Sequence, residues 1–334
     1  LVCSLPLLKA LKKHFTQSEI TLLIDNKLSE LANLCDSKDR IIGYKRGLLS
    51  KTGLLFRIKR DKFDMAVILN PLFQGAWIAY FSEAKYRLGY VHDYEGFQNI
   101  EKLSCLLTHP IVPADKPMHD RRRYLDIAES LGAEITDTAL ELLIPEKAIK
   151  WADTFLRDNA VKDNDFILGI NPHAGWESKC WDTQRFSEVA DIMREKYNAR
   201  VIFFGSSAAG DIARINLIKS SLKHKAMYAA GKTDIPELAA LLKRCSIFLT
   251  NDSGPMHLAA ALGINMVALF GPSDVRKFGY EKENIINITT NESLYNPCIF
   301  NYRHKNSSGN NVYMKSIGSE DVIKAIEVLL RNKK

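Results

Sequence analysis

The chain has 334 residues, of which 46% are hydrophobic and 25% are charged, so it is long enough for two globular domains. No apolar run reaches the roughly 20 residues of a membrane span, and the apolar start lacks the preceding lysines of a secretory signal. The net charge of +7 favours an anionic partner, such as a phosphorylated ligand or a membrane face, with solubility as the plain alternative.

Strand-like and helix-like segments alternate along the first half of the chain. Helical spacing is clearest in residues 118–131, where Tyr124, Ile127 and Leu131 share one apolar face. The chain starts with Leu1 inside a predicted helix, so we expect that a first strand is missing from the sequence. The predicted helices are residues 5–14, 28–34, 48–60, 75–82, 118–131 and 146–158, and the predicted strands are residues 20–24, 40–42, 65–69 and 86–89.

The second half has a clearer pattern. Strands separated by helices of ordinary length predict parallel sheets with right-handed crossovers. Two such halves predict two doubly wound domains, residues 1–158 and 159–334, with a ligand crevice between them. The predicted strands are residues 166–170, 200–204, 226–228, 246–249 and 265–270; the predicted helices are residues 184–196, 209–222, 235–243 and 320–331, with another from about residue 255, and residues 292–314 are expected to be irregular.

The most informative stretch is residues 249–263, LTNDSGPMHLAAALG. An apolar strand leads into a polar turn, and a helix of small residues begins near Pro255, where a missing N–H costs nothing. Backbone N–H groups and the positive helix end then face the crevice, which predicts a site for phosphate or another anion. A second turn, Gly271-Pro272-Ser273-Asp274, follows the next strand at the same sheet edge, so we expect a nucleotide site there.

The loop at residues 171–181, NPHAGWESKCW, follows another buried strand at its carboxyl end, where ligands bind in such sheets. Its small residues allow close backbone approach, and Lys179 offers a point charge for phosphate. Trp181 is expected to pack under the loop. The alternative is a plain surface loop with a solvated lysine, which the neighbouring Asp252 turn disfavours.

Several patterns admit a plainer interpretation. Gly231-Lys232-Thr233 lacks the earlier glycine of a P-loop, because Ala226 stands there, and a capped helix start at Thr233 or Asp234 explains it better. The glycines around residues 205–210 lack dinucleotide-binding spacing, which argues against an NAD enzyme. Asp163-Asn164-Asp165 precedes its strand and is interpreted as a solvated linker, not a metal site. The six cysteines form no C-x-x-C pair and fit free thiols in a reducing cytoplasm.

Two groups of basic residues leave both interpretations open. His257 lies one helical turn into the helix after Asp252, where it contacts either phosphate or sugar, or serves as a core or capping histidine. His119 and the arginines at residues 121–123 start a helix in the first half, as a solvated basic face or as a contact for an anionic acceptor.

Several of these segments together resemble glycosyltransferase family 9, the ADP-heptose:lipopolysaccharide heptosyltransferases. The resemblance covers nearly the whole chain. The matching segments are residues 1–11, LVCSLPLLKAL; the loop from Ala174 to Trp181; residues 251–257, NDSGPMH, with residues 270–274, FGPSD; Cys298; and Met314-Lys315.

The resemblance implies a GT-B fold, with an N-terminal acceptor domain and a C-terminal domain that binds ADP-heptose. The implied reaction is inverting transfer of L-glycero-D-manno-heptose to the lipopolysaccharide inner core, without a metal or other cofactor. By the same resemblance Lys179 holds the donor phosphates and stabilises the departing diphosphate, and Asp252 contacts the heptose hydroxyls. The remaining donor-binding residues implied by the resemblance are Ala174, Gly175, Thr233, Ser253, Gly254 and His257, with Asp211 as a candidate for the ribose.

The resemblance also implies a general base in a Gly-Asp pair ahead of the first helix, which would fall immediately before Leu1. Because inverting transfer needs a base, the chain as given is expected to bind donor and transfer poorly, through truncation rather than loss of function. The expected partners are ADP-heptose and a lipid A-core acceptor, with no nucleic acid, at the cytoplasmic face of the inner membrane. The alternatives are a catalytically silent nucleotide-sugar-binding protein and another GT-B enzyme, such as a nucleotide-sugar epimerase.

Overall fold

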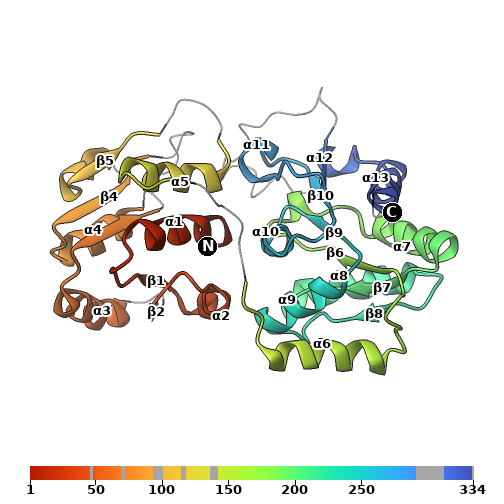
Figure 1. Ribbon diagram of the computed structural model, residues 1–334. Coiled ribbons are helices and arrows are strands. Elements are labelled where there is room, and N and C mark those ends of the chain that lie inside the picture. Colours follow the sequence, from red (N-terminus) through yellow and green to blue (C-terminus); the bar gives the residue numbers. More distant parts are fainter. Residues whose placement is uncertain are drawn as a thin grey trace. The chain divides into compact units, whose positions relative to one another are not determined.

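The computed structural model describes residues 1–45, 48–69, 72–92, 101–113, 118–135, 142–290 and 312–332. The chain forms two compact units, Cys3–Ala139 and Leu140–Lys334 (Figure 1). The domain boundary expected after residue 158 stays a prediction. Helix α6 (Glu146–Asp158), which that boundary places in the first domain, packs against α9 (Ile235–Arg244) of the second unit.

The described residues of the first unit form five parallel-paired strands in two groups. Strands β1 (Thr21–Asp25) and β2 (Arg40–Tyr44) pair in the register Thr21 to Arg40. Strands β3 (Met65–Ile68), β4 (Tyr86–Tyr90) and β5 (His109–Ile111) form the second group in that order. Parallel pairing throughout agrees with the expected strand–helix alternation.

Helices cover these strands and supply most of the core. The helices are α1 (Leu5–His14), α2 (Ser29–Asn33), α3 (Leu48–Asp61), α4 (Phe73–Phe81) and α5 (Asp120–Ser130). Helix α1 packs on α5 through Leu7 and Leu11 against Tyr124 and Ile127. Helix α4 instead uses Ala76 and Ala79, which bury against Ile68 of β3.

The second unit is built on a six-stranded, fully parallel sheet in the order β11-β10-β9-β6-β7-β8. Its inner strands are buried on both faces, as expected for a doubly wound sheet. The strands are β6 (Ile167–Asn171), β7 (Arg200–Phe203), β8 (Met227–Tyr228), β9 (Ile247–Asn251), β10 (Met266–Phe270) and β11 (Ile285–Thr289).

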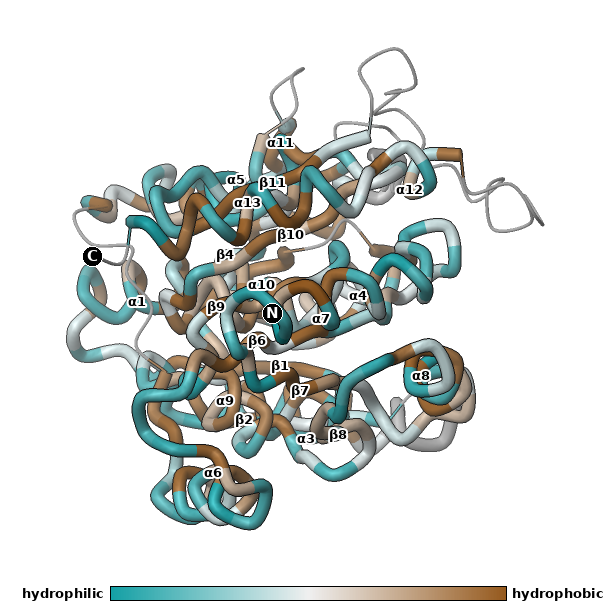
Figure 2. Tube along the Cα trace, turned by 90° about the vertical axis from the view of Figure 1, so that its right-hand side faces the viewer, coloured by the Kyte–Doolittle hydropathy of each residue, from teal (hydrophilic) through white to brown (hydrophobic). Residues whose placement is uncertain are grey.

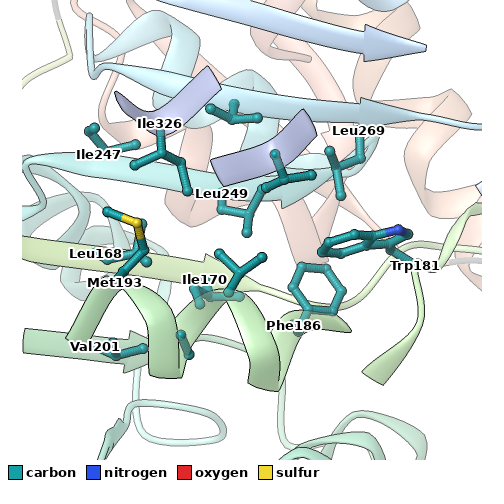
Figure 3. Close-up of a cluster of buried hydrophobic side chains, with 14 of the residues drawn as sticks. Leu168, Ile170, Trp181, Phe186, Met193, Val201, Ile247, Leu249, Leu269 and Ile326 are labelled. Carbon is teal, nitrogen blue, oxygen red and sulfur yellow. The ribbon is translucent and has the colours of Figure 1, made fainter. Parts of the chain in front are cut away.

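The main core of this unit lies between the sheet and one layer of helices (Figure 3). The layer consists of α7 (Thr183–Tyr197), α8 (Ala209–Ser221) and α13 (Ser319–Arg331). Helices α9 and α10 (Gly254–Ala261) pack together, and α10 lies against β9 and β10. Strands β9 and β10 are mostly hydrophobic in Figure 2, whereas α7 and α13 alternate, so these helices bury one face only.

The elements that were not predicted include β5, β11, the short helix α11 (Val275–Phe278) and the 3-10 helices at Asn26–Leu28 and Glu101–Leu106. A further short helix, α12 (Val312–Lys315), begins inside the segment expected to be irregular. The rest of that segment up to residue 311, with Cys298, lies outside the described residues. Among the helices that the structure describes, none is both long and apolar enough to cross a membrane.

Candidate functional site

The loops that follow β6 and β9 meet at one edge of the second sheet. These strands are neighbours, and their register pairs Asn171 with Thr250, the residues near their carboxyl ends. The loop after β6 contains Lys179, and the turn after β9 contains Asp252 and leads into α10. The predicted convergence of the two motifs is therefore built by adjacent parallel strands.

Asn171 connects these two loops. Its side-chain amide nitrogen lies 3.1 Å from the His173 carbonyl oxygen, 3.2 Å from Thr250 Oγ1 and 3.1 Å from Ser253 Oγ. Asn171 and Thr250 are buried, so these bonds are shielded from water. Ser253 precedes α10, and its position is thereby tied to the end of β6.

Lys179 and Asp252 form a buried ion pair. Lys179 Nζ lies 2.6 Å from Asp252 Oδ2, and the side chains are only 14% and 5% exposed. Burial alone raises the pKa of Asp252, but the charge of Lys179 and its hydrogen bond outweigh burial and hold that pKa below its usual value. Asp252 is therefore a carboxylate at neutral pH, and the pair presents both charges at the strand ends.

Aromatic rings surround the ammonium group of Lys179. Nζ lies 5.3 Å from the centre of the Trp176 ring and 5.6 Å from the centre of the Phe278 ring. Cation–π contacts of this kind attract the ammonium group and help to fix its position. Phe278 belongs to α11, which follows the Gly271–Asp274 turn after β10. The segments after β6, β9 and β10 therefore all contribute side chains to the surroundings of Lys179.

His257 is the fourth residue of α10, and its side chain forms a hydrogen bond with Tyr280. Its Nδ1 is 2.9 Å from the Tyr280 hydroxyl, and the His257 charge helps to lower the pKa of Asp252, so the imidazole is near the ion pair. The imidazole is only partly buried, and its contact with ligand stays a prediction.

Open space lies above two glycines of the site. A Cβ built on Gly175 or on Gly254 would have no heavy atom within 4 Å. Gly254 begins α10, whose first-turn N–H groups and positive helix end suit an anion. A ligand can approach the backbone closely at both positions.

The loop after β6 is anchored from below by Trp181, as predicted. Its indole Nε1 donates to the Ile317 carbonyl at 3.0 Å, and its backbone N–H donates to Asn251 Oδ1 at 3.2 Å. Trp181 is fully buried and meets Phe186 edge to face. The segment before α13 is therefore part of the support of the site.

A second polar pair joins the loop after β6 to α8 and was not predicted. His173 Nδ1 is 3.1 Å from Asp211 Oδ1, and Asp211 Oδ2 accepts from the backbone N–H and hydroxyl of Ser206. Burial lowers the pKa of His173, more than the Asp211 charge raises it, so the imidazole is neutral at pH 7. Asp211, the ribose candidate, is thus held at the start of α8.

The structure brings some predicted residues together and separates others. Lys179, Asp252, Ser253, Gly254 and His257 lie around the β6 and β9 ends. Ala174 and Gly175 lie in the same loop as Lys179. Thr233 follows β8 at the far edge of the sheet, where Asp234, rather than Thr233, caps α9 with a capping box. Sequence analysis missed the contributions of Asn171, His173, Phe278 and Tyr280.

Two other patterns can be compared with their plainer interpretations. Asp163 is solvent-exposed ahead of β6, at the opposite sheet edge, which agrees with a linker. In the first unit His119 caps α5 through a bond from the Arg121 N–H. Arg122 pairs with Asp126 and Glu129 on the same helix, whereas Arg123 is buried beside Asp120, so a solvated basic face describes this segment only in part, and an acceptor contact stays a prediction.

Comparison with known proteins identifies relatives along the whole chain. The model of glycosyltransferase family 9 (heptosyltransferase) matches residues 53–303. Lipopolysaccharide heptosyltransferase 3 of Escherichia coli K12 is 27% identical over 97% of this chain and 93% of its own length.

Solved structures agree on the fold. The family 9 glycosyl transferase of Veillonella parvula superposes with a TM-score of 0.84 at 26% identity, covering 99% of this chain and 93% of its own. The E. coli ADP-heptose lps heptosyltransferase II gives 0.78 at 20% identity, over 100% and 96% of the two chains. These neighbours confirm the predicted GT-B fold.

Proposed function

Because this chain belongs to glycosyltransferase family 9, the heptosyltransferases, we propose that it transfers heptose from ADP-L-glycero-D-manno-heptose to the lipopolysaccharide core, with inversion and without a metal. The observation that carries the donor site is the buried Lys179–Asp252 pair beside the start of α10. Family membership supports the transfer class, and the site residues support where the donor binds.

In this proposal Lys179 holds the donor diphosphate. As the bond between the sugar carbon and the diphosphate oxygen breaks, negative charge collects on that oxygen. An ammonium group in a largely dry site stabilises such charge much more than the same group in water. The N–H groups at the start of α10 and the side chain of His257 face the same phosphates, and Ala174 and Gly175 let the backbone approach them.

Asp252 binds the sugar in this proposal. A carboxylate with a lowered pKa is a weak base, so Asp252 is better suited to accept hydrogen bonds from heptose hydroxyls than to take a proton from the acceptor. Thr233 is assigned to the adenine end of the donor, and the first unit to the acceptor. The acceptor is a lipid-linked core sugar, which places the protein at the cytoplasmic face of the inner membrane.

Calorimetric titration of the chain with ADP-heptose tests the donor assignment, with UDP-N-acetylglucosamine as the competing ligand. We expect selective binding of ADP-heptose, weakened at least about tenfold by Lys179→Met because a charge-assisted phosphate contact is lost. Lys196→Met is the matched control: its Nζ also lies 2.6 Å from a carboxylate, Glu327, but between α7 and α13. It should leave donor affinity unchanged.

The outcomes separate the alternatives. Preference for the UDP sugar would move the activity to another GT-B reaction. Tight ADP-heptose binding without transfer to a lipid A-core acceptor, even with the Gly-Asp segment of the family joined ahead of Leu1, would favour the silent binding protein. Equal binding by Lys179→Met and the unaltered chain would overturn the role of Lys179.

A further inference from the structure

Helix α4 turns a stripe of aromatic side chains away from the core of the first unit. Phe73 is 55% exposed, and Tyr80 and Phe81 are also exposed, while Ala76 and Ala79 of the same helix are buried. Trp77 lies between these rings and the core: it packs against the buried cluster that contains Ala76 and Ala79, and its ring is stacked on Phe81 at 5.3 Å between centres and lies 5.7 Å from Phe73. Phe73, Tyr80 and Phe81 are the rings that remain exposed.

A neighbouring helix carries a further exposed ring. Helix α3 packs beside α4 (Figure 1) and carries Phe56, which is 77% exposed. Lys59, one turn further along α3, forms an ion pair of 2.6 Å with Glu83 just after α4. The exposed aromatic residues of α3 and α4 therefore lie on adjacent helices that are tied at one end. A monomeric protein rarely exposes so many large rings together without a partner.

Positive charge accompanies the rings. Residues 56–87 contain six basic and three acidic residues, an excess of three positive charges. The Arg87 guanidinium lies 5.7 Å from the centre of the Tyr80 ring, and Lys85 Nζ lies 5.2 Å from the centre of the Tyr86 ring. Arg60 on α3 and Lys85 are exposed, whereas Arg87 also donates to the Leu106 and Ala84 carbonyls. We call the exposed rings of Phe56, Phe73, Tyr80 and Phe81, with the cations Arg60, Lys85 and Arg87, the aromatic–basic surface.

We propose that the aromatic–basic surface binds the headgroup region of an anionic lipid bilayer. Aromatic rings concentrate at the membrane–water boundary, where an apolar body and a polar edge are both satisfied. Lysine and arginine beside them are attracted by anionic headgroups, so two weak forces combine into reversible binding. The proposal rests on the proposed function in one respect: a lipid-linked acceptor makes a bilayer the surface on which the protein works.

Flotation of the full chain with lipid vesicles tests the proposal, with no sugar donor or acceptor present. We expect binding to vesicles of phosphatidylethanolamine and phosphatidylglycerol, little binding to pure phosphatidylcholine, and weaker binding at about 0.5 M salt, where screening is strong. The pair Phe56→Ser and Phe73→Ser should lower partitioning at least about tenfold, because it removes two apolar side chains from the contact. The double variant Arg60→Glu and Lys85→Glu should remove most of the salt-sensitive part of vesicle binding.

Leu217→Ser and Val328→Ser are the controls. Both residues are exposed apolar side chains of the second unit, on α8 and α13, and their loss should leave vesicle binding unchanged. Circular dichroism and donor titration confirm that each variant is folded. Donor binding lies in the other unit, so loss of vesicle binding with normal donor affinity supports the surface, whereas loss of donor binding alone would count against the proposed function.

Three results would overturn the proposal. One is equal binding of the aromatic variant and the unaltered chain. Another is no preference for anionic vesicles. The third is a concentration-dependent dimer in solution that Phe56→Ser and Phe73→Ser dissociate, since the surface would then be an interface between copies of the chain.

Discussion

The buried ion pair of the site predicts an unequal response to removal of its two partners. Lys179→Met leaves Asp252 as a carboxylate that is 95% buried without its cation, since only 5% of that side chain is exposed. Removing one partner of a buried pair costs about 3–5 kcal/mol, and we expect about 3 kcal/mol here because the loop can relax. Asp252→Asn leaves an ammonium on a flexible stem, which can turn toward water, and should cost about 1–2 kcal/mol.

The loss of folding stability in Lys179→Met should depend on pH, and the direction of that dependence follows from the pKa of Asp252. In the unaltered chain the pKa of Asp252 is lowered, so its contribution to stability is constant above the ordinary value of 3.8 and is lost only as pH falls through the lower folded value. In Lys179→Met the effect of burial, which is the largest single cause, outweighs the remaining Ser273 hydrogen bond and His257 charge, so we expect the pKa of Asp252 in the folded state to rise above that of the unfolded state. The folded variant then binds the extra proton, so its deficit should shrink as pH falls from about 7 to about 5.

Urea unfolding at several pH values measures these differences, with Lys196→Met as the exposed control. In the Lys179→Met background, Asp252→Asn should restore stability, because it removes the unpaired charge. The reasoning fails if the Lys179→Met deficit is independent of pH, if Asp252→Asn is the more damaging single change, or if the double variant loses the sum of the two single losses.

Three further predictions concern the surroundings of the pair. Gly254→Ala places a methyl group in open space at the start of α10, where the donor is proposed to bind. The stability of this variant should be unchanged, while its calorimetric donor affinity should fall about tenfold. Gly210→Ala on α8 is equally open and should stabilise the protein by up to about 1 kcal/mol without affecting donor binding. The buried, neutral His173 takes up a proton on unfolding, so the stability of the unaltered chain should fall as pH drops through 6.5, and less so in His173→Gln; parallel unfolding curves of the two proteins against pH would contradict this. Tyr280→Phe removes the hydroxyl 2.9 Å from His257 Nδ1 and should cost about 1 kcal/mol and weaken donor binding in titrations, and unchanged donor affinity would exclude Tyr280 as a positioning residue.

The sequence was most informative where local physics decides the structure. The buried strands β6, β9 and β10 are continuous apolar runs, and α9 begins at an Asp234–Glu237 capping box, so these elements could be predicted without knowledge of their neighbours. Their carboxyl ends had to meet at one edge because parallel strands with helical crossovers leave no other arrangement. The meeting of Lys179 with Asp252 follows from that topology.

The missed elements are those whose pattern is set by the tertiary structure. Strand β5 is three residues long and contains Pro110, which cannot donate to a ladder and argues against a strand when seen alone. Strand β11 lies at the sheet edge, and Asn287 interrupts its apolar run. The contact between His173 and Asp211 joins the segments that follow β6 and β7, so no pattern of residues close in sequence predicts it.

A buried ion pair adds little to stability compared with hydrophobic residues in the same place. The Lys179–Asp252 pair is therefore better explained by its role in preparing the site for the donor. In the absence of donor, the charge of Lys179 helps to keep Asp252 ionised in a site where burial favours the neutral acid. A phosphate that reaches Lys179 therefore meets an amine already fixed by the Trp176 and Phe278 rings and by a loop anchored through Trp181. The groups need little rearrangement as charge develops on the leaving diphosphate, which is the condition for strong electrostatic stabilisation of a transition state.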